Sequence, residues 1–540
     1  MAAPPVPGPT TASYYFLERP DPSVVTARGT PGPTPGAAPA QGPSTPAQRP
    51  SAPAAHAHTT PAIPGFPGLP GLPTFPGIPS VPTGDRSPGD RSPGGRSPGG
   101  PAAPADGPPR FYATEPGAAL RPEDHPVDPD RHPAFDVETI RRDFPILRER
   151  VNGHQLIWLD NAATTQKPQA VIDRLTYFYE HENSNIHRAA HELAARSTDA
   201  YERSRDTVAR FLGAGSAEEI VFVRGATEAI NLVAQTWGRS HIRQGDEIVI
   251  SHLEHHANIV PWQMLAAQTG AVIKVIPVDD SGALIMSEYT RLLSDRTKLV
   301  SVTQVSNALG TITPAREIVE QGHRAGACVL IDGAQSVPHT RVDLQEMGAD
   351  FFVFSGHKIF GPTGIGVLFG RSDVLQDMPP WQGGGNMITD VTLERSVYQP
   401  PPGRFEAGTG NIADAVGLGT ALEYVERIGI DAIAAYEHDL LDYATPQLAD
   451  VSGLHLVGTA PAKASVMSFV LDGYDPVEVG RALNERGIAV RAGHHCAQPI
   501  LRRLGYEATV RPSLAFYNTR AEVDVLVREL HRLAAERGRR

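Results

Sequence analysis

Polar residues directly follow three apolar runs in this sequence. The run CVLI is followed by DGAQ (332–335), the run FFVF by SGHK (355–358), and the run EIVI by SHLEHH (251–256). Ligands of mostly parallel sheets bind beyond the carboxyl ends of the strands. If the three runs are such strands, these segments are the first in which to look for a site.

An acid after one run and an amine after a later one form the pair that pyridoxal phosphate (PLP) requires. Asp332 would keep the pyridine nitrogen protonated, and Lys358 would supply the amine of the Schiff base. The chain has only five lysines, and the other four lie before a proline, inside an apolar run, beside two charged residues and in an alanine-rich loop. The pattern predicts PLP as the cofactor and Lys358 as its attachment point, against the alternative of an ordinary surface lysine.

A glycine turn between a strand and a helix could hold the phosphate of the cofactor. In VFVRGATEAIN (221–231), Gly225 gives the turn and Thr227 lies where the helix begins, so its hydroxyl and the first backbone amides could bind an anion. Many α/β units have such a junction for packing alone. The prediction of Thr227 as a phosphate ligand therefore depends on Asp332 and Lys358.

The histidine-rich segment allows two interpretations. His255 could stack on a pyridine ring or move protons near neutral pH. Alternatively, His252, His255 and His256 together with HHC (494–496) resemble a set of zinc ligands. Their spacing matches no closed tetrahedral site and offers no paired cysteines, so we predict no metal.

The chain has two cysteines, and their surroundings differ. Cys496 lies in VRAGHHCAQP, close to Arg491, His494 and His495, and such a cationic loop favours the thiolate, which is the nucleophilic form. Cys328 opens the run CVLI, so we expect it to be a buried small hydrophobic residue.

The elements that must position these residues form an alternating pattern. Seven apolar runs are separated by helical patterns: EIVFVRG, DEIVIS, AVIKVIPVD, TKLVSVTQV, CVLIDGAQ, DFFVFSGHK and GIGVLFG. They predict an α/β fold with a mostly parallel sheet that is covered on both faces. Asp136 is the predicted N-cap of the first helix. An amphipathic helix is predicted at the end of the chain from the spacing of Val523, Leu526, Val527, Leu530 and Leu533.

The first 135 residues differ in composition from the rest. Of the 51 prolines, 34 lie before residue 134, and a short repeat occupies GDRSPGDRSPGGRSPGG (84–100). Such a segment lacks the backbone donors and apolar residues of a packed core, so residues 1–135 are predicted to be a disordered Pro/Gly/Ser-rich extension. Two aromatic patches, at 13–25 and 110–116, are either docking motifs or incidental apolar residues.

Charge and composition exclude several classes of function. A net charge of −12 argues against nucleic acid as a partner, and two cysteines are too few for a disulfide framework, which favours a cytoplasmic protein. The N-terminus has no basic and apolar leader, and no apolar run reaches the length of a membrane span.

Several separated motifs resemble one known family. They are DNAATTQKP (160–168), NIHRAAHELA, RGATEAINLVA, EHHANIVPWQ, VSNALGT, DGAQ, SGHKIFGPTGIG, RFEAGTGN and RAGHHCAQP. Together they cover about residues 136–535 and are similar to the cysteine desulfurases of the class V aminotransferase family. The loop RAGHHC resembles that of the group II, or sulfur-mobilisation, type.

The resemblance implies a fold and a division into domains. It implies PLP fold type I: a large domain with a mostly parallel seven-stranded sheet and a smaller α+β domain. We expect the large PLP-binding domain at 156–425, and the small domain, with the cysteine loop, at 136–155 and 426–540. A homodimer is also implied.

The resemblance also implies roles for single residues. Lys358 would carry the cofactor, Asp332 would hold its ring nitrogen and Gln335 its hydroxyl, and His255 would stack on the ring. Ligands of the phosphate would be Thr227, Ser355, His357 and, from the second subunit, Thr409, and Ala226 would also bind the cofactor. Asn307 and Arg511 would hold the carboxylate of the substrate, and His187 would lie at the mouth of the pocket.

The chemistry that the resemblance implies is the conversion of L-cysteine to L-alanine. The sulfur would pass to Cys496 as a persulfide and then to an acceptor protein or thiol. A selenocysteine lyase, another class V enzyme of this group, and a scaffold protein with a degenerate enzyme core are the alternatives. Ordinary members lack the N-terminal extension, which resembles that of cargo desulfurases packaged in family 2 encapsulin shells.

Overall fold

The computed structural model describes residues 135–187 and 191–537 of the chain. The predicted extension and its two aromatic patches lie outside the described residues.

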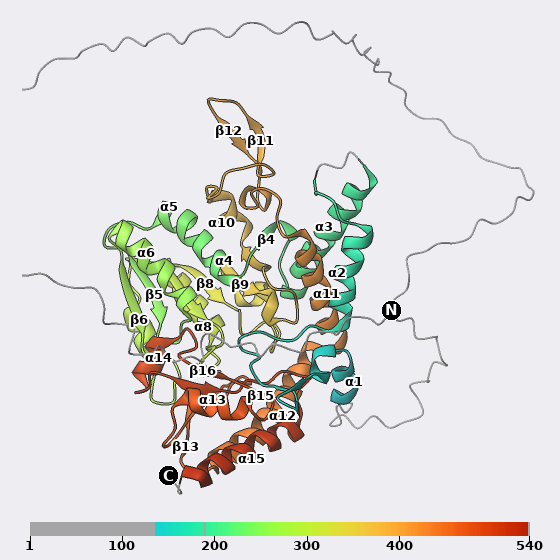
Figure 1. The fold of residues 1–540 in the computed structure, drawn as a ribbon. Coiled ribbons are helices and arrows are strands. Elements are labelled where there is room, and N and C mark those ends of the chain that lie inside the picture. Colours follow the sequence, from blue (N-terminus) through green and yellow to red (C-terminus); the bar gives the residue numbers. More distant parts are fainter. Residues whose placement is uncertain (1–134, 188–190, 538–540) are drawn as a thin grey trace, which may run out of the picture. The chain divides into compact units, whose positions relative to one another are not determined.

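A seven-stranded sheet forms the centre of the larger part of the chain (Figure 1). Its strands lie in the order β4 (Ile220–Val223), β10 (Gly366–Gly370), β9 (Phe351–Ser355), β8 (Cys328–Asp332), β7 (Thr297–Thr303), β5 (Glu247–Ser251) and β6 (Val272–Ile276). Only β10 runs antiparallel to its neighbours β4 and β9, and the other pairs are parallel. Each predicted apolar run contains one of these strands, so the mostly parallel sheet is confirmed.

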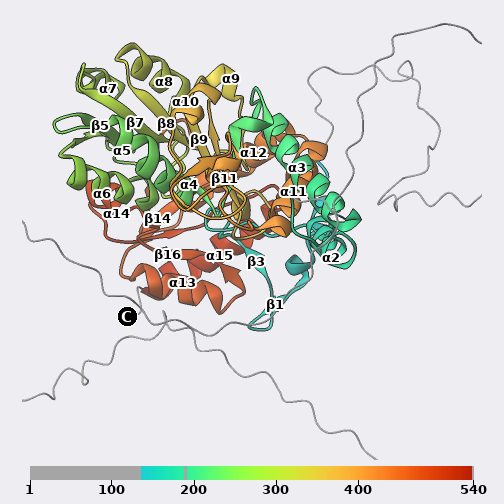
Figure 2. The same ribbon diagram turned by 90° about the horizontal axis from the view of Figure 1, so that it is seen from above.

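Both faces of this sheet are covered by helices (Figure 2). Alternate side chains of β9 enter two different cores: Phe352 and Phe354 pack with residues of α8 and α11, whereas Phe351 and Val353 pack with residues of α4 and α6. This alternation is what a strand buried on both sides requires. The helices of this part are α2 (Gln169–His181), α3 (Glu192–Leu212), α4 (Ala226–Val233), α5 (Arg239–His241), α6 (Val260–Thr269), α7 (Met286–Leu292), α8 (Ala315–Arg324), α9 (Leu344–Met347), α10 (Ser372–Asp377) and α11 (Ile412–Ile428).

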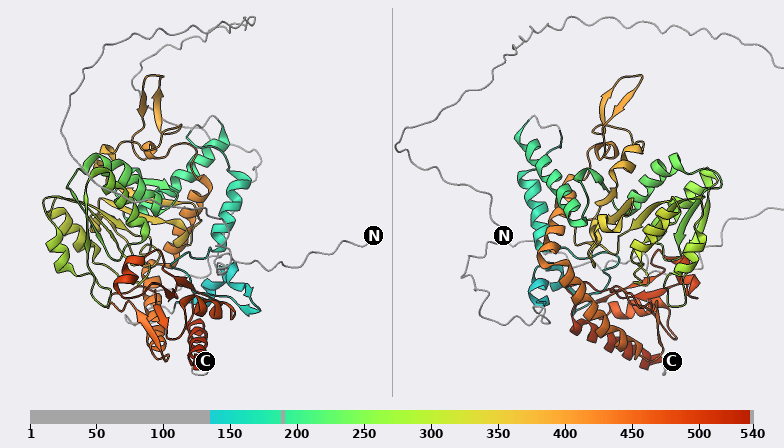
Figure 3. Two further views of the ribbon diagram at one scale, coloured as in Figure 1. Left: turned by 60° about the vertical axis from the view of Figure 1, so that its left-hand side comes forward. Right: turned by 180° about the vertical axis from the view of Figure 1, so that it is seen from behind.

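The C-terminal part builds a second, smaller sheet with its own core (Figures 1 and 3). Its strands lie in the order β13 (Leu454–Val457), β14 (Ser468–Leu471), β17 (Thr509–Arg511) and β16 (Arg491–Gly493). The helices are α12 (Ile430–Ala449), α13 (Pro476–Asn484), α14 (Gln498–Arg503) and α15 (Arg520–Arg537). All five apolar residues predicted for the last helix are buried in this core, so the amphipathic α15 is confirmed.

The first described residues connect the two parts. Asp136 caps α1 (Val137–Arg142) by accepting a hydrogen bond from the amide of Thr139, as predicted. Phe144 packs in the core that contains β9 and α11, whereas Ile157, in β3 (Ile157–Trp158), packs with α15 and pairs with β15 (Ile488–Ala489). The chain thus passes from one core to the other between Phe144 and Ile157. The segment between them contains β1 (Arg150–Val151) and β2 (His154–Gln155).

A hairpin of β11 (Ile388–Val391) and β12 (Ser396–Tyr398) projects from the larger part (Figures 1 and 3). Leu393 at its tip is fully exposed. Within residues 135–187 and 191–537, the helices are too short or too polar to cross a lipid bilayer.

Candidate active site

Lys358 lies in a short turn directly after β9, next to the strand end that carries Asp332. Burial lowers the pKa of Lys358 to about 8, while the charge of Asp332 raises it and that of Arg511 lowers it. Cys496 and Arg491 act on the same amine with smaller effects of opposite sign. Asp332, the last residue of β8, and Lys358, in the turn after β9, thus lie at the same end of two neighbouring strands.

Asp332 is almost completely buried at the end of β8, with 4% of its surface exposed. One carboxylate oxygen accepts a hydrogen bond of 3.0 Å from the amide of Ala334. Burial raises the pKa of Asp332, and the charge of Lys358 opposes this. Gln335, three residues further on, is buried and donates from Nε2 to the carbonyl of Ala162 at 2.6 Å.

The beginning of α4 meets the end of β9 at the predicted phosphate site. The amide of Ala226, the first residue of α4, donates to Ser355 Oγ at 2.9 Å. Thr227 follows with an exposed side chain. His357 is partly buried, and burial together with the charges of Lys358 and Lys167 lowers its pKa to about 4. Backbone amides and hydroxyls at a helix N-terminus form a typical site for a phosphate.

His255 is partly buried and neutral. Burial is the largest cause that lowers its pKa, to about 3, and the charge of Lys358 adds to it. Its Nδ1 accepts a hydrogen bond of 3.1 Å from the amide of Ala257, so the proton of the neutral ring lies on Nε2. A neutral imidazole in this place can stack on a pyridine ring without adding a charge.

The cysteine loop has an unusual backbone. His495 and Cys496 both have a φ of 53°, in the left-handed region that residues other than glycine rarely adopt. Two hydrogen bonds hold the turn: the amide of Cys496 donates to His494 Nδ1 at 3.1 Å, and the amide of His256 donates to the Cys496 carbonyl at 2.8 Å. The loop is therefore tied to the segment that carries His255.

Asn307 and Arg511 lie together under this loop. Asn307 donates from Nδ2 to the carbonyl of His495 at 2.7 Å, and its own carbonyl accepts from Arg511 Nη1 at 2.8 Å. Arg511 is 2% exposed, and its Nη2 lies 3.2 Å from a carboxylate oxygen of Asp160. Burial lowers the pKa of Arg511 to about 10, which leaves the guanidinium charged at neutral pH.

His187 and Thr409 lie in a second cluster. His187 Nε2 lies 2.7 Å from Glu202 Oε1, an interaction that raises the pKa of the histidine, and Thr409 donates to Asn185 at 3.4 Å. Among the described residues, no hydrogen bond or ion pair joins either residue to Lys358. The predicted roles of both stay predictions.

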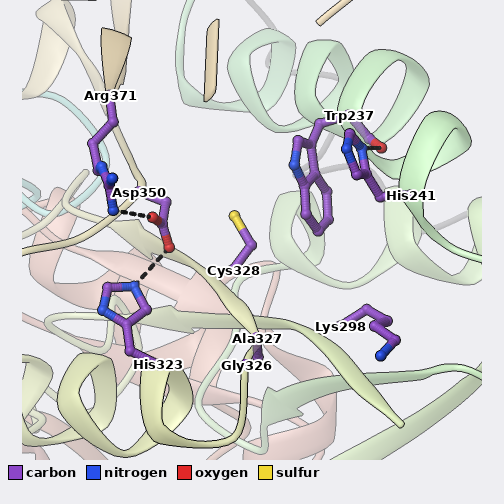
Figure 4. Close-up of a pocket in the computed structure, with 9 residues that line it drawn as sticks. All are labelled: Trp237, His241, Lys298, His323, Gly326, Ala327, Cys328, Asp350 and Arg371. Carbon is purple, nitrogen blue, oxygen red and sulfur yellow. Dashed lines mark hydrogen bonds and ion pairs between the residues drawn. The ribbon is translucent and has the colours of Figure 1, made fainter. Parts of the chain in front are cut away.

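The expectation for Cys328 is wrong in part. The side chain packs against the core of α4 and α6 but is only partly buried, and it lines a cavity of about 380 Å³ beside Trp237, His323 and Asp350 (Figure 4). This cavity lies at the amino end of β8, opposite to Asp332 at its carboxyl end. Burial and the charge of Asp350 raise the pKa of this thiol well above its usual range. Residues far along the chain, such as Trp237 and Arg371, also line this cavity, and a single apolar run cannot reveal them.

Some of the histidines that resembled zinc ligands lie close together, with the ring centroids of His255 and His256 6.2 Å apart. Among residues 135–187 and 191–537, no group of three or more histidine, cysteine or acidic side chains could hold a metal ion. The rings of His256 and His494 instead stack, with centroids 5.8 Å apart.

Two acids of the site were not predicted. Asp160 pairs with both Arg511 and Arg491, each at 3.2 Å. Glu254 is fully buried and accepts hydrogen bonds from Ser251, Asn258 and the amide of Thr303. Glu254 lies between histidines shortly after an apolar strand, and this position in the sequence could have indicated that it belongs to the site.

The donors and acceptors of the site fit PLP. An amine of lowered pKa, a buried carboxylate, a neutral imidazole and a helix N-terminus are the groups that this cofactor needs. Three buried atoms, Asn307 Oδ1, Arg511 Nε and His495 Nδ1, have no hydrogen-bond partner in the described structure, although buried polar groups nearly always have one. A bound ligand with a carboxylate and polar groups would satisfy them.

The sheet order, the second small sheet and the lysine after β9 define the fold as PLP fold type I. Residues 157–526 match the class-V aminotransferase family, and the chain belongs to this family. An apo cysteine desulfurase from Thermococcus onnurineus NA1 has a similar structure, with a TM-score of 0.71 and 38% identity over 74% of this chain and 98% of that one. A cysteine desulfurase of Escherichia coli, solved as its S-sulfonic acid, has a TM-score of 0.70 and 38% identity over 75% and 99%.

Relatives in sequence carry similar names. A probable cysteine desulfurase of Mycobacterium leprae is 71% identical over 400 residues, which are 74% of this chain and 66% of that protein. A cysteine desulfurase of Dickeya dadantii is 52% identical over 400 residues, 74% of this chain and 97% of that protein. The chain spans only 59% and 64% of two further relatives, from Mycolicibacterium paratuberculosis and Synechococcus elongatus.

Proposed function

We propose that this chain is a PLP-dependent cysteine desulfurase that converts L-cysteine to L-alanine and takes the sulfur on Cys496. The observation that carries the proposal is the set of hydrogen bonds that ties the Cys496 loop to His256 and, through Asn307, to Arg511. The names of the relatives with 71% and 52% identity agree with it.

Lys358 would act first as a nucleophile and then as a base. An ordinary lysine is almost completely protonated at neutral pH, but a pKa of about 8 leaves a useful fraction of neutral amine. When bound, PLP supplies an electron sink for the bonds at the α-carbon of the substrate. Lys358, freed by the substrate amine, would remove the α-proton from that carbon.

Arg511 and Asn307 would orient the substrate. Arg511 uses one N–H of Nη2 for Asp160 and one of Nη1 for the Asn307 carbonyl, so three of its five N–H donors, Nε among them, are left for a carboxylate. The backbone carbonyl of Asn307 accepts from the same guanidinium, and the side-chain amide of Asn307 donates to the cysteine loop at His495. A cysteine substrate whose carboxylate is held here would have its sulfur directed toward Cys496.

Cys496 would receive the sulfur. Its thiolate attacks the sulfur of the substrate, a new S–S bond forms, and the C–S bond breaks with its electron pair left on the β-carbon, which takes up a proton. The sum is L-cysteine plus a thiol giving L-alanine plus a persulfide. The thiolate is the form of Cys496 that this step needs.

The test compares the two cysteines. Cys496→Ser should abolish alanine formation from L-cysteine and leave the absorbance of bound PLP unchanged. Cys328→Ser is the matched control, and we expect its activity to stay within about twofold of the wild type, since this thiol lies at the opposite end of β8. Full alanine formation by Cys496→Ser would contradict the proposal, and activity on selenocysteine alone would favour a selenocysteine lyase.

We also propose that the enzyme works as a homodimer in which Thr409 reaches the phosphate of the partner subunit. Thr409 is exposed, and together with Asn185 it lines a cavity of about 440 Å³. A mixture of Thr409→Ala and Lys358→Ala chains tests this. If Thr409 acts across the dimer, both defects fall in the same site of a mixed dimer, so the other site is intact and activity returns.

The N-terminal extension, we propose, directs loading into an encapsulin shell through residues 13–25 and 110–116. The composition of residues 1–135 supports this, together with the length that the relatives from Mycobacterium leprae and Synechococcus elongatus carry beyond the matched part. Chains with and without residues 1–135 should be co-expressed with a family 2 shell protein. Equal amounts of both inside purified shells would contradict the proposal.

A further inference from the structure

Lys463 is a charged residue that the proposed mechanism does not use. Its ammonium donates hydrogen bonds to the carbonyls of Leu309 and Gly458, the latter at 2.8 Å. Among the described residues, no ion pair involves Lys463, and burial lowers its pKa to about 8. Because Lys463 is held by two carbonyls and by no acid, it acts on the surrounding structure through those two hydrogen bonds.

The two carbonyls belong to different parts of the fold. Gly458 directly follows β13 of the small sheet, whereas Leu309 lies in the loop after β7 of the large sheet. Lys463 therefore connects the two sheets at this point. Leu309 is two residues from Asn307.

The loop that contains Leu309 depends on the small sheet for its shape. Within residues 306–312, the carbonyl of Ala308 accepts from Ser468 Oγ at 2.5 Å, the carbonyl of Gly310 accepts from the amide of Ala464 at 2.8 Å, and the amide of Ile312 donates to Ala462 at 3.0 Å. Gly310 has a φ of 78°, and a Cβ there would lie 2.9 Å from the carbonyl oxygen of Ala464. Two charged side chains donate to carbonyls of this loop: the ammonium of Lys463 to Leu309 and the guanidinium of Arg511 to Asn307.

The same loop holds the proposed substrate site. Asn307 is 6% exposed and makes hydrogen bonds to Arg511 and to the carbonyl of His495 beside Cys496. A shift of the Leu309 carbonyl would therefore move the group that joins the guanidinium to the cysteine loop.

We propose that Lys463 is a positioning residue, which holds residues 306–312 so that Asn307 and Arg511 can bind the carboxylate of the substrate. The inference rests on the proposed function for its kinetic consequence. The inference that Lys463 holds residues 306–312 in place rests only on the hydrogen bonds of the described structure.

The test compares Lys463→Met, which keeps the length and loses the donor, with Lys463→Arg, which restores it. Lys463 lines a cavity of about 340 Å³, so a guanidinium has room. Lys298→Met is the control, since Lys298 donates only to the carbonyl of Asp295 at the far end of β7. The protein is used as the full chain loaded with PLP.

We expect Lys463→Met to raise the KM for L-cysteine about tenfold, the size of one lost hydrogen bond to a charged group, with kcat within about twofold. Lys463→Arg should restore KM to within about twofold of the wild type. Amide hydrogen exchange of the peptide that spans 304–313 should become faster in Lys463→Met and stay unchanged in Lys298→Met. If Lys463→Met does not fold, Lys463→Gln, which can reach one carbonyl, replaces it, and we expect an intermediate KM.

An unchanged KM together with unchanged exchange would overturn the proposal, as would a loss in kcat alone. If the wild-type chain forms no alanine from L-cysteine, the proposed function fails, and the exchange measurement still decides whether Lys463 holds the loop.

Discussion

The amine of Lys358 illustrates how burial prepares a single residue for chemistry. Removing an ammonium from water costs free energy, so the neutral amine gains population at a lower pH than in solution. Asp332 limits this effect because its charge favours the ammonium, and Arg511 strengthens it. The pKa of about 8 is the balance of these causes.

This balance predicts a pH profile for cofactor uptake by the apo-protein. The neutral amine is the reactive form, and its fraction grows as the pH rises through the pKa. The rate of PLP incorporation, followed by absorbance, should rise with pH and level off above about 8. A rate that keeps rising toward about 10.4, as for an unperturbed lysine, would contradict the pKa given to Lys358.

Glu254 is a buried acid that stabilises the segment directly before His255. Its carboxylate accepts hydrogen bonds from a serine, an asparagine and a backbone amide, and burial raises its pKa to about 8. Glu254→Ala would leave these buried donors unpaired, so we expect the free energy of unfolding to fall by about 3 kcal/mol. Urea unfolding measures it, and Glu394→Ala, on the exposed hairpin, should change it by less than about 0.5 kcal/mol. Equal stability of both variants would show that the network does not stabilise the fold.

At the scale of elements, β10 lies in close contact with the turn before α4, where the phosphate site is proposed. A Cβ on Gly366 would lie 2.5 Å from the Cα of Gly225 and 2.6 Å from the carbonyl oxygen of Phe354. Both neighbours are backbone atoms, so neither can give way cheaply. Gly366 thus allows the N-terminus of α4 to lie against Ser355.

Gly366→Ala should therefore push α4 away from β9. We expect a loss of about 1–3 kcal/mol in the free energy of unfolding and a weaker affinity for PLP, measured by equilibrium titration of the apo-protein. Gly383→Ala is the control, because no atom lies within 4 Å of a Cβ at that position. Equal PLP affinity in both variants would argue against this contact as a part of the phosphate site.

The elements were more predictable than their contacts. The seven strands and the last helix follow from local patterns, since strands that are buried on both faces need continuous apolar runs. Lys358 and Asp332 could be proposed because each lies at or just after the end of an apolar run: Asp332 is the last residue of β8, and Lys358 lies three residues after β9. The pairing of Asp160 with Arg511 joins residues 351 positions apart, and the cavity beside Cys328 is lined by residues from five separate segments, so neither has a local signal.

At the scale of the whole molecule, the described fold and the proposed catalytic residues all lie after position 134. Deletion of residues 1–134 should therefore leave the thermal midpoint within about 2 °C and the KM for L-cysteine within about twofold of the full chain. Differential scanning calorimetry and steady-state kinetics check this. A chain that loses its cooperative transition after the deletion would show that the extension takes part in the fold.

The central claim is that Lys358 and Cys496 act on one substrate molecule. The most direct measurement is a single turnover of the PLP-loaded protein with less than one equivalent of L-cysteine, followed by alanine analysis and mass spectrometry of the peptide that contains Cys496. The account predicts one sulfur atom added to Cys496 for each alanine formed. Sulfur on Cys328, or alanine formed while Cys496 stays unmodified, would contradict it.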